Sequence, residues 1–210
     1  MTGMGFAGVF DIHLTVAAAD DDVERLGGWS ASNGVKFTHI ELARGQVRSQ
    51  PMLTIAGRGT LSEQRAAASA CAARLRKEGF EVVRVKIEAA PWNADVPEDR
   101  ATATALTGCY FEHHVKVLLP DDVTVLGELA ELAGAHSAHV SRNARRERGD
   151  DSHERFVTQR CRSVGLPTAR RRLETLLDAL ESRGFAVLEA EQEFVVHDDN
   201  PEVDRGWIEE

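Results

Sequence analysis

The chain carries the same pattern of residues twice, and this internal repeat limits its possible folds more than any other feature. The matched strings are FDIHLTV (10–16) with FEHHVKV (111–117), DDV (21–23) with DDV (121–123), and Gly79-Phe80 with Gly184-Phe185. The offset between matches stays between 100 and 105 residues along the whole repeat. Because chance matches would not keep this order, we interpret the chain as a tandem duplication.

Each copy shows the periodicities of a strand, a helix, two strands, a helix and a strand, in that order. In the first strand, apolar Phe10, Ile12 and Leu14 alternate with polar Asp11 and His13, as in a half-buried strand. The expected strands are 9–16, 35–43, 51–57 and 81–89 in the first copy and 110–118, 136–142, 153–161 and 185–196 in the second. The first helices are expected at 21–33 and 121–133.

The second helix of each copy has apolar residues at positions i, i+3, i+4 and i+7, which form one stripe for packing on a sheet. They are Ala68, Cys71, Ala72 and Leu75 in one copy and Leu173, Leu176, Leu177 and Leu180 in the other. Thr60 and Glu63 have the spacing of a capping box, and Pro167 suits the first turn of the second of these helices.

The order βαββαβ is that of the ferredoxin-like unit, in which both helices cover one face of an antiparallel four-stranded sheet. We therefore predict an α+β protein with two such units, at 9–89 and 110–196. A linker, 90–109, joins them, and an acidic tail, 197–210, follows. Trp92 and Trp207 are expected to dock the linker and the tail on the units.

The helix-free faces of both sheets are expected to be polar. Strand parity places there Asp11, His13, Thr15, His39, Glu41, Arg84, Lys86 and Glu88 in the first copy and Glu112, His114, Lys116, His139, Ser141, Glu189, Glu191 and Glu193 in the second. Arg84 and Lys86 align with Glu189 and Glu191, so facing sheets would pair opposite charges. We predict that the two polar faces meet in a cleft or a barrel, the alternative being ordinary solvent-facing strands.

Four histidines form two matched pairs, His13 with His114 and His39 with His139. A histidine titrates near neutrality, and two of them can act as acid and base on one substrate. We therefore take all four as candidate catalytic residues, while inherited structural histidines are the alternative.

Basic residues of the second copy suggest an anionic ligand. Lys116 lies beside His114 on the same strand, Arg142 and Arg145 belong to an arginine-rich stretch, and Arg160 ends a strand. The guanidinium fork suits carboxylate or phosphate groups. We expect these residues to bind a small anion, although an arginine-rich surface loop is the simpler interpretation.

The string HLTV (13–16) resembles the H-x-T-x signature of the 2H phosphoesterase superfamily, which has one motif in each of two duplicated lobes. The resemblance implies that His13 and His114 act as acid and base on a phosphodiester or cyclic phosphate, and that Thr15 holds the phosphate. In the second copy, Lys116 stands where that family has the hydroxyl residue.

A second resemblance covers nearly the whole chain. The strings PWNADVP (91–97), YFEHHVK (110–116) and SRNARR (141–146) are similar to an uncharacterised family of actinobacterial hypothetical proteins. That resemblance implies no particular activity.

Composition narrows the compartment and the partners. The net charge of −9 disfavours general binding to nucleic acid or to an anionic membrane. Three cysteines without CxxC spacing fit a reducing cytoplasm, and the first 16 residues have no basic region typical of a signal peptide. We expect a cytoplasmic monomer or homodimer.

These features favour an enzyme for a small anionic ligand, with phosphate-ester hydrolysis as the leading reaction. Binding of a ligand or a partner without chemistry is the first alternative. A metal-dependent enzyme is the second, with Glu112, His114, His139 and either Glu41 or Glu189 as ligand types, although no fixed-spacing metal motif is present. The sequence identifies neither a metal nor a cofactor.

Overall fold

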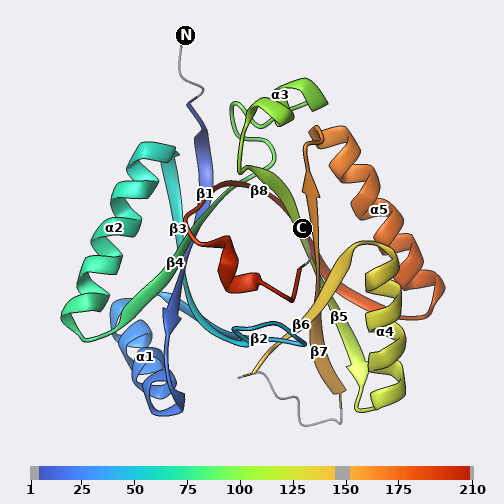
Figure 1. The fold of residues 1–210 in the computed structure, drawn as a ribbon, viewed down its shortest axis with the longest axis horizontal. Helices are drawn as coiled ribbons and strands as arrows, with labels where there is room; N and C mark the ends of the chain where they lie inside the picture. Colours follow the sequence, from blue (N-terminus) through green and yellow to red (C-terminus); the bar gives the residue numbers. More distant parts are fainter. Residues whose placement is uncertain (1–4, 145–151, 209–210) are drawn as a thin grey trace.

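Eight strands close into one antiparallel barrel in the computed structural model, which describes residues 5–144 and 152–208 (Figure 1). Their order around the barrel is β1-β3-β2-β6-β7-β5-β8-β4. The bounds in the first repeat are β1 Ala7–Ala17, α1 Asp20–Asn33, β2 Lys36–Leu42, β3 Ser49–Thr60, α2 Leu61–Lys77 and β4 Glu81–Ala89. Those in the second are β5 Tyr110–Pro120, α4 Val123–Ala135, β6 Ala138–Asn143, β7 Ser152–Arg162, α5 Leu166–Ser182 and β8 Ala186–Asp198.

The predicted duplication of a βαββαβ unit is confirmed. Each repeat contributes four consecutive strands of the barrel, and its two long helices lie on the outside of those strands (Figure 1). Two antiparallel seams join the repeats. At one seam β2 pairs with β6, with Glu41 opposite Arg142, and at the other β4 pairs with β8, with Ala89 opposite Phe194. The two polar faces therefore form the inside of a barrel, the second of the two expected arrangements.

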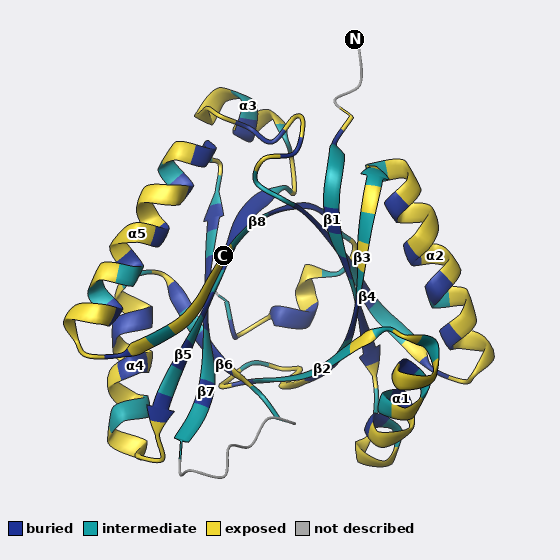
Figure 2. Ribbon diagram, turned by 180° about the vertical axis from the view of Figure 1, so that it is seen from behind, coloured by how far each residue is buried: buried dark blue, intermediate teal, exposed yellow. Residues whose placement is uncertain are grey.

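The apolar core lies between the barrel and the helices. Figure 2 shows that the buried residues of the helices face the strands. One cluster includes Ile12, Leu53 and Leu75, and another includes Val115, Leu129 and Leu176, all fully buried. The second cluster lies wholly within the second repeat, whereas the first also includes Phe111, Cys161 and Phe194 of that repeat, so the first core continues across the seam of β4 with β8.

Local signals at the helix ends match the structure. Thr60 and Glu63 form a complete capping box at the start of α2, and Pro167 lies in the first turn of α5. Gly34 follows α1 with a φ of 64°, the left-handed conformation that a helix-ending glycine adopts at little cost.

The linker contains one short helix, α3 (Arg100–Ala105), and packs against both repeats. Asn93 donates to Val9 O and accepts from Val9 N, while Leu166 N donates to Pro97 O over 2.8 Å. Trp92 does not dock this segment, because its side chain is 77% exposed and Asn93 supplies the attachment instead.

The tail turns into the barrel. After β8, a 3-10 helix, η1 (Pro201–Asp204), lies inside the ring of strands in Figure 1. Trp207 is buried and its indole Nε1 donates to Val140 O over 3.1 Å, so this tryptophan docks the tail as predicted. Within the described residues, no helix has the length and apolar character needed to cross a bilayer.

Truncation of a core side chain should lower the free energy of unfolding more than truncation of an exposed side chain of the same barrel. Leu53→Ala should lower the free energy of unfolding by about 2–5 kcal/mol, because Leu53 is fully buried between β3 and the helices. Leu188→Ala is the matched control on β8, where the side chain is 45% exposed and the expected change is within about 0.5 kcal/mol. Urea unfolding of both variants checks this, and equal losses would contradict the assignment of the core.

Candidate functional site

A cavity of about 370 Å³ lies inside the barrel. This volume is at the lower end of the range of small-molecule sites, about 300–1,000 Å³. Its described lining includes seven carboxyl side chains, five lysines or arginines and two histidines. The acidic ones are Asp11, Glu88, Glu112, Glu189, Glu191, Glu193 and Asp204, and the basic ones are Lys36, Arg84, Lys86, Lys116 and Arg160. The site is therefore charged but does not have the excess of cations expected for a simple anion pocket.

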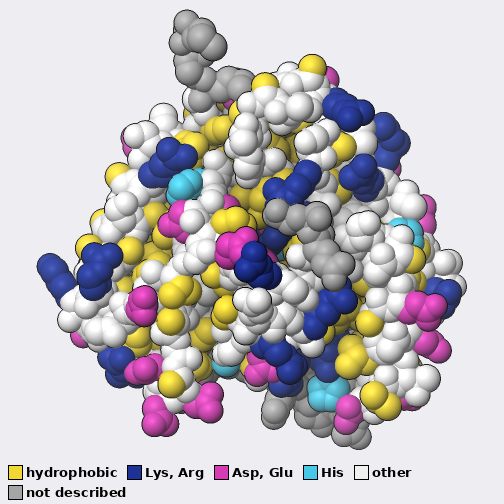
Figure 3. Space-filling model, in the orientation of Figure 1, with side chains coloured by type: hydrophobic (Ala, Val, Ile, Leu, Met, Phe, Trp, Pro, Cys, Tyr) yellow, Lys and Arg dark blue, Asp and Glu magenta, His cyan; other side chains and the backbone are white. Residues whose placement is uncertain are grey.

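Side chains cover the barrel end that faces the viewer in Figure 3. Acidic and basic side chains lie next to one another over the middle of that face. The gap between ribbons in Figure 1 is therefore not an open channel.

His13 is held at both ring nitrogens. On β1 it lies opposite Thr54 of β3, and its Nδ1 is 3.0 Å from Thr54 Oγ1. Its Nε2 is 2.5 Å from Glu88 Oε2 on β4. The threonine and the glutamate together fix the plane of the imidazole ring, with Nε2 directed at the carboxylates of the cavity.

His114 repeats this arrangement in the second half of the barrel. It lies opposite Thr158 of β7, with 3.2 Å between Nδ1 and Thr158 Oγ1. Its Nε2 is 3.3 Å from Glu112 Oε2 and 4.0 Å from Glu193 Oε2. His114 is thus held more loosely than His13, and its side chain is also more exposed, 25% against 13%.

A continuous chain of buried charges joins the two histidines. The Lys86 ammonium donates to Glu112 Oε2 and makes an ionic contact of 2.7 Å with Glu88 Oε1. Arg160 Nε donates to Glu112 Oε1 over 2.6 Å. Glu88 and Glu112 are fully buried, so each carboxylate depends on these cations to remain charged.

The pKa values of these two carboxyl groups reflect that dependence. Burial by itself would raise the pKa of Glu88, but Lys86 and His13 reverse the effect and hold it well below its usual value. Burial is likewise opposed at Glu112, where Lys86 and Arg160 hold the pKa well below normal. Both groups are carboxylates at neutral pH.

Glu193 behaves in the opposite way. It lies opposite Glu112 in the register of β5 with β8. Burial, together with the adjacent Glu88 carboxylate, raises the pKa of Glu193 to about 10. The cluster therefore contains a carboxylic acid that keeps its proton at neutral pH beside carboxylates that do not.

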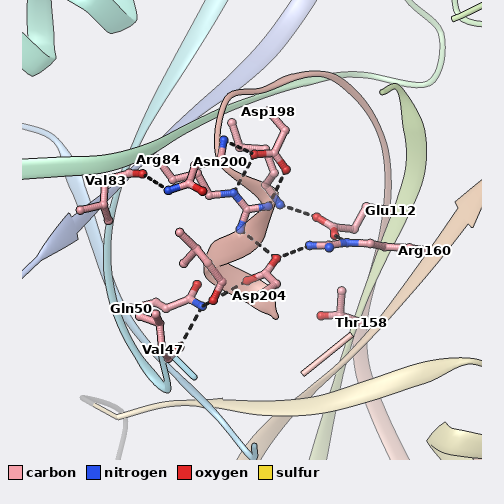
Figure 4. Close-up of polar contacts among 12 residues, drawn as sticks. Val47, Gln50, Val83, Arg84, Glu112, Thr158, Arg160, Asp198, Asn200 and Asp204 are labelled. Carbon is pink, nitrogen blue, oxygen red and sulfur yellow. Dashed lines mark hydrogen bonds and ion pairs between the residues drawn. The ribbon is translucent and has the colours of Figure 1, made fainter. Parts of the chain in front are cut away.

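Two arginines meet at the tail. Arg84 Nη1 and Arg160 Nη2 donate to the same Asp204 oxygen, Oδ2, over 2.8 and 2.5 Å (Figure 4). Gln50 Nε2 donates to Asp204 Oδ1 over 3.1 Å. Burial opposes ionisation of Asp204, but the two arginines lower its pKa.

Most of the residues predicted for this site line the cavity. Thr15, Lys116 and Arg160 do so together with His13 and His114. Lys116 pairs with Glu189, so that cation already has an anionic partner in the protein. His139 is not among the described residues that line the cavity, and its ring lies beside that of Trp207, with 5.9 Å between the centroids.

Other predictions for the site are not met by the geometry. Thr38 and Ile40 of β2 line the cavity, so His39 between them has the opposite parity, and its Nε2 is 2.8 Å from Ser49 Oγ. Arg142 also has outward parity on β6 and pairs with Glu41. His39 and Glu41 were therefore predicted on the wrong face, and Arg142, which we expected among the anion-binding residues, lies on a strand with its side chain outside the cavity.

The reason for this difference lies in the pairing of β2 with β3. Lys36 and Thr38 are opposite Thr54 and Met52, which line the cavity. Phe37, at the parity of His39, packs against the first apolar core. Contact of this half-buried ring with the core thus favours the outward direction of the odd-numbered side chains of β2. Arg145 lies outside the described residues.

Sequence reasoning missed three features of this site. Thr54 and Thr158, which orient the histidines, occupy equivalent positions in the two repeats, so the duplication itself could have identified them. Asp204 follows the repeats and has no counterpart, and no sequence pattern indicates that it turns inward.

Two overlapping groups of side chains have the composition and spacing of metal ligands. They are His13, Glu88 and Glu193, and Glu88, Glu112 and His114, with ligand atoms within 4.8 Å of one another in each group. Lys86 already supplies a positive charge between Glu88 and Glu112. The first group is therefore the better fit to a cation. The first group contains none of the metal ligands predicted from the sequence, whereas the second group contains two of them, Glu112 and His114.

Comparison with known proteins gives no family. Neither a protein-family model nor a curated protein sequence matches this chain. Among solved structures, it is similar to the small subunit of acetolactate synthase from Thermotoga maritima, with 15% identity over 89% of this chain and 94% of that one, at a TM-score of 0.28. It is also similar to chlorite dismutase from Candidatus Nitrospira defluvii in complex with imidazole, with 12% identity over 90% and 91%, at a TM-score of 0.29. Likeness at this level transfers no function.

The raised pKa of Glu193 predicts a specific dependence of stability on pH. The folded state keeps a proton that the unfolded state loses above pH 4.5, so this group's contribution to stability falls as pH rises toward 10. The loss should reach up to about 1.4 kcal/mol per pH unit. Urea unfolding between pH 5.5 and 9 should show this decline in the wild-type protein and a flatter profile in Glu193→Gln.

Glu191→Gln is the matched control. Glu191 lines the same cavity from the same strand, two residues away. Its replacement should leave the wild-type slope in place. A Glu193→Gln variant with the wild-type slope would show that Glu193 is ionised in the folded protein.

Proposed function

We propose that the barrel interior is an active site for a small polar molecule, in which His13 and His114 transfer protons to and from the ligand. The observation that carries this proposal is the repeated geometry of the two histidines. Each Nδ1 lies within hydrogen-bond distance of a threonine hydroxyl, and each Nε2 faces the acidic cluster of the cavity. Such fixed rings suit general acid–base catalysis, which needs the proton-carrying atom held in one place.

The different settings of the two rings support different roles. The short contact of His13 Nε2 with the Glu88 carboxylate suits a ring nitrogen that donates its hydrogen, which we assign as the acid. The looser contacts of His114 leave Nε2 able to accept a proton from a ligand, which makes it the base. Thr15, buried on β1, supplies a hydroxyl to the same cavity.

Phosphate-ester hydrolysis is the reaction that we propose first. The resemblance of HLTV (13–16) to the 2H phosphoesterase signature supports it, together with the placement of His13 and Thr15 on one inward face. The balance of charges in the cavity favours a compact ligand with one or two negative charges, because the cavity's described arginines and Lys116 are already paired with carboxylates. Ligand binding without chemistry would use the same cavity and the same cations.

A metal-dependent enzyme is the second candidate function. The ligand atoms of His13, Glu88 and Glu193 favour it, since one histidine and two carboxyl groups at the wall of a cavity form an open catalytic set, in which Glu193 would lose its proton to solvent when the ion binds. In that case His13 would hold the ion rather than transfer a proton.

We infer a reducing compartment for this chemistry, consistent with a cytoplasmic protein. All three cysteines are free, and Cys71 and Cys161 are buried in the core between strands and helices. General nucleic-acid binding stays an unfavoured alternative because of the net charge of −9.

Substitution of each histidine in turn should affect turnover strongly at His13 and His114 but not at the outward-facing His39. With a panel of cyclic nucleotides and phosphodiesters, His13→Asn and His114→Asn should each lower turnover by about 100-fold or more, the usual contribution of a positioned acid or base. His39→Asn is the matched control, because His39 is on a strand but outside the cavity, and its activity should stay within about twofold of wild type. Equal effects in all three variants would contradict the proposed roles.

Elemental analysis distinguishes the second candidate. A metal enzyme purified without added metal or chelator should carry about one divalent transition-metal ion per chain, reduced at least tenfold in His13→Ala and in Glu193→Gln. His39→Ala should keep the metal content of the wild-type protein. Metal-free protein that also fails to bind zinc or manganese on dialysis would contradict the metal-dependent enzyme and leave the acid–base function.

A further inference from the structure

One carboxylate inside the barrel is held by side chains from three strands. Asp204 accepts hydrogen bonds from Arg84 of β4, Arg160 of β7 and Gln50 of β3, at 2.8, 2.5 and 3.1 Å (Figure 4). All three donors are buried: the Arg84 and Arg160 side chains are 5% and 6% exposed, and Gln50 is 5% exposed. This is a built and desolvated carboxylate site, filled by a residue of the same chain.

The two arginines do not depend on Asp204 for their orientation. Asp198, at the end of β8, accepts from Arg84 Nε and Nη2 over 2.9 and 2.6 Å. Glu112 of β5 accepts from Arg160 Nε over 2.6 Å. Each guanidinium is therefore fixed on one side by a strand residue, and another of its nitrogens, Nη1 of Arg84 or Nη2 of Arg160, donates to Asp204.

This position requires a negative charge. Asp198 and Glu112 each balance part of the charge of these arginines, but Glu112 also pairs with Lys86. Removal of Asp204 would leave two buried guanidinium groups short of counter-charge, which is strongly destabilising. Any state in which Asp204 leaves must therefore bring another anion to the same place.

Asp204 belongs to a segment that is an addition to the duplicated fold. In the first repeat, the chain after β4 runs into the linker outside the barrel, whereas after β8 residues 199–208 turn inward. Apart from the isolated Arg205–Ile208 bridge, this segment takes part in no described strand pairing. Its buried side chains are Val203, Asp204 and Trp207, while Glu202 and Arg205 pair with one another on the surface.

We propose that Arg84, Arg160 and Gln50 form the binding site for the carboxylate group of a small-molecule ligand, and that Asp204 occupies this site in cis until the ligand displaces it. The inference rests on the proposed function for the location of the ligand and adds a carboxylate group to the phosphate ester proposed there. Glu112 contacts both Arg160 and His114, so a ligand anchored at the arginines would extend into the cavity beside the base. The tail then acts as an internal competitor that keeps the arginines neutralised in the absence of ligand.

A carboxylate fits these donors better than a phosphoryl group. The site already holds a carboxylate with both oxygens satisfied, one by two guanidinium N–H groups and the other by an amide. A phosphoryl group would add a third oxygen and, at neutral pH, nearly a second charge, whereas the three hydrogen bonds to Asp204 already match the two oxygens and single charge of a carboxylate.

The first test is rescue of a variant of the full-length chain by a small anion. Asp204→Ala should melt about 5 °C or more below the wild-type protein, because it leaves the arginines short of counter-charge. Sodium formate, at constant ionic strength set with chloride, should restore most of this loss in a saturable way. Glu202→Ala is the matched control on the exposed side of the same segment. In this variant and in the wild-type protein, the formate concentration that gives half of the response should be at least tenfold higher.

Three outcomes of this test overturn the proposal. Absence of a formate response in folded Asp204→Ala, or an equal response in Asp204→Ala/Arg160→Met, would show that the arginines form no anion site. A phosphate midpoint below that of formate would overturn the assignment to a carboxylate. Should Asp204→Ala fail to fold, Asp204→Asn keeps the size of the side chain and is titrated in the same way.

Displacement of the tail is tested with Asp204 intact. Trp207→Ala removes one of the tail's other buried anchors, so formate should accelerate hydrogen exchange of the amides of residues 203–207 in this variant severalfold. Exchange that formate leaves unchanged would show that Asp204 is a permanent structural group. None of these measurements involves the histidines, so their failure is distinguishable from failure of the His13 and His114 substitutions.

Discussion

The contact on which the interior of this protein depends is that of Glu112 with Lys86 and Arg160. The glutamate and the arginine belong to the second repeat, and the lysine belongs to the first. All three are buried, and a buried carboxylate is stable as an anion only when cations and hydrogen-bond donors replace water. Arg160 comes from the same repeat as Glu112 but Lys86 from the other, so the neutralisation of Glu112 is complete only when the barrel closes.

The same constraint explains why the two repeats match outside and differ inside. Between barrel and helices, both copies bury aliphatic and aromatic side chains, and a conservative exchange there costs little. Inside the barrel, like charges at equivalent positions would repel one another across the cavity. Arg84 and Lys86 on β4 correspond to Glu189 and Glu191 on β8. The expected pairing of these opposite charges is not what the barrel uses, because Arg84 pairs with Asp198 and Asp204, and Lys86 pairs with Glu88 and Glu112. The histidines and their threonine partners are kept in both copies, so the geometry of the proposed proton transfer has retained the symmetry that the charged network has lost.

The tail adds a negative charge and a buried aromatic side chain to the interior of the barrel. Asp204 brings a negative charge to two arginines, and Trp207 fills part of the same space while its indole nitrogen binds a backbone carbonyl of β6. The cavity therefore has a wall that is not part of either repeat. A ligand that replaced this wall would gain the contacts of Asp204 without any rearrangement of the barrel strands, and this is the physical basis for treating the tail as a competitor.

The sequence by itself determined the duplication, the βαββαβ order and the inward face of β1 and β5, because these follow from local periodicity and from alignment of the two copies. It also determined that His13, Thr15, His114 and Lys116 share that face. Only the tertiary structure decided the orientation of β2, where Thr38 and Ile40 line the cavity and His39 and Glu41 have the opposite parity. The tertiary structure also decided the protonation of Glu193 and the place of Asp204. Both depend on the sum of charges that distant strands bring together, and no pattern along the chain records that sum.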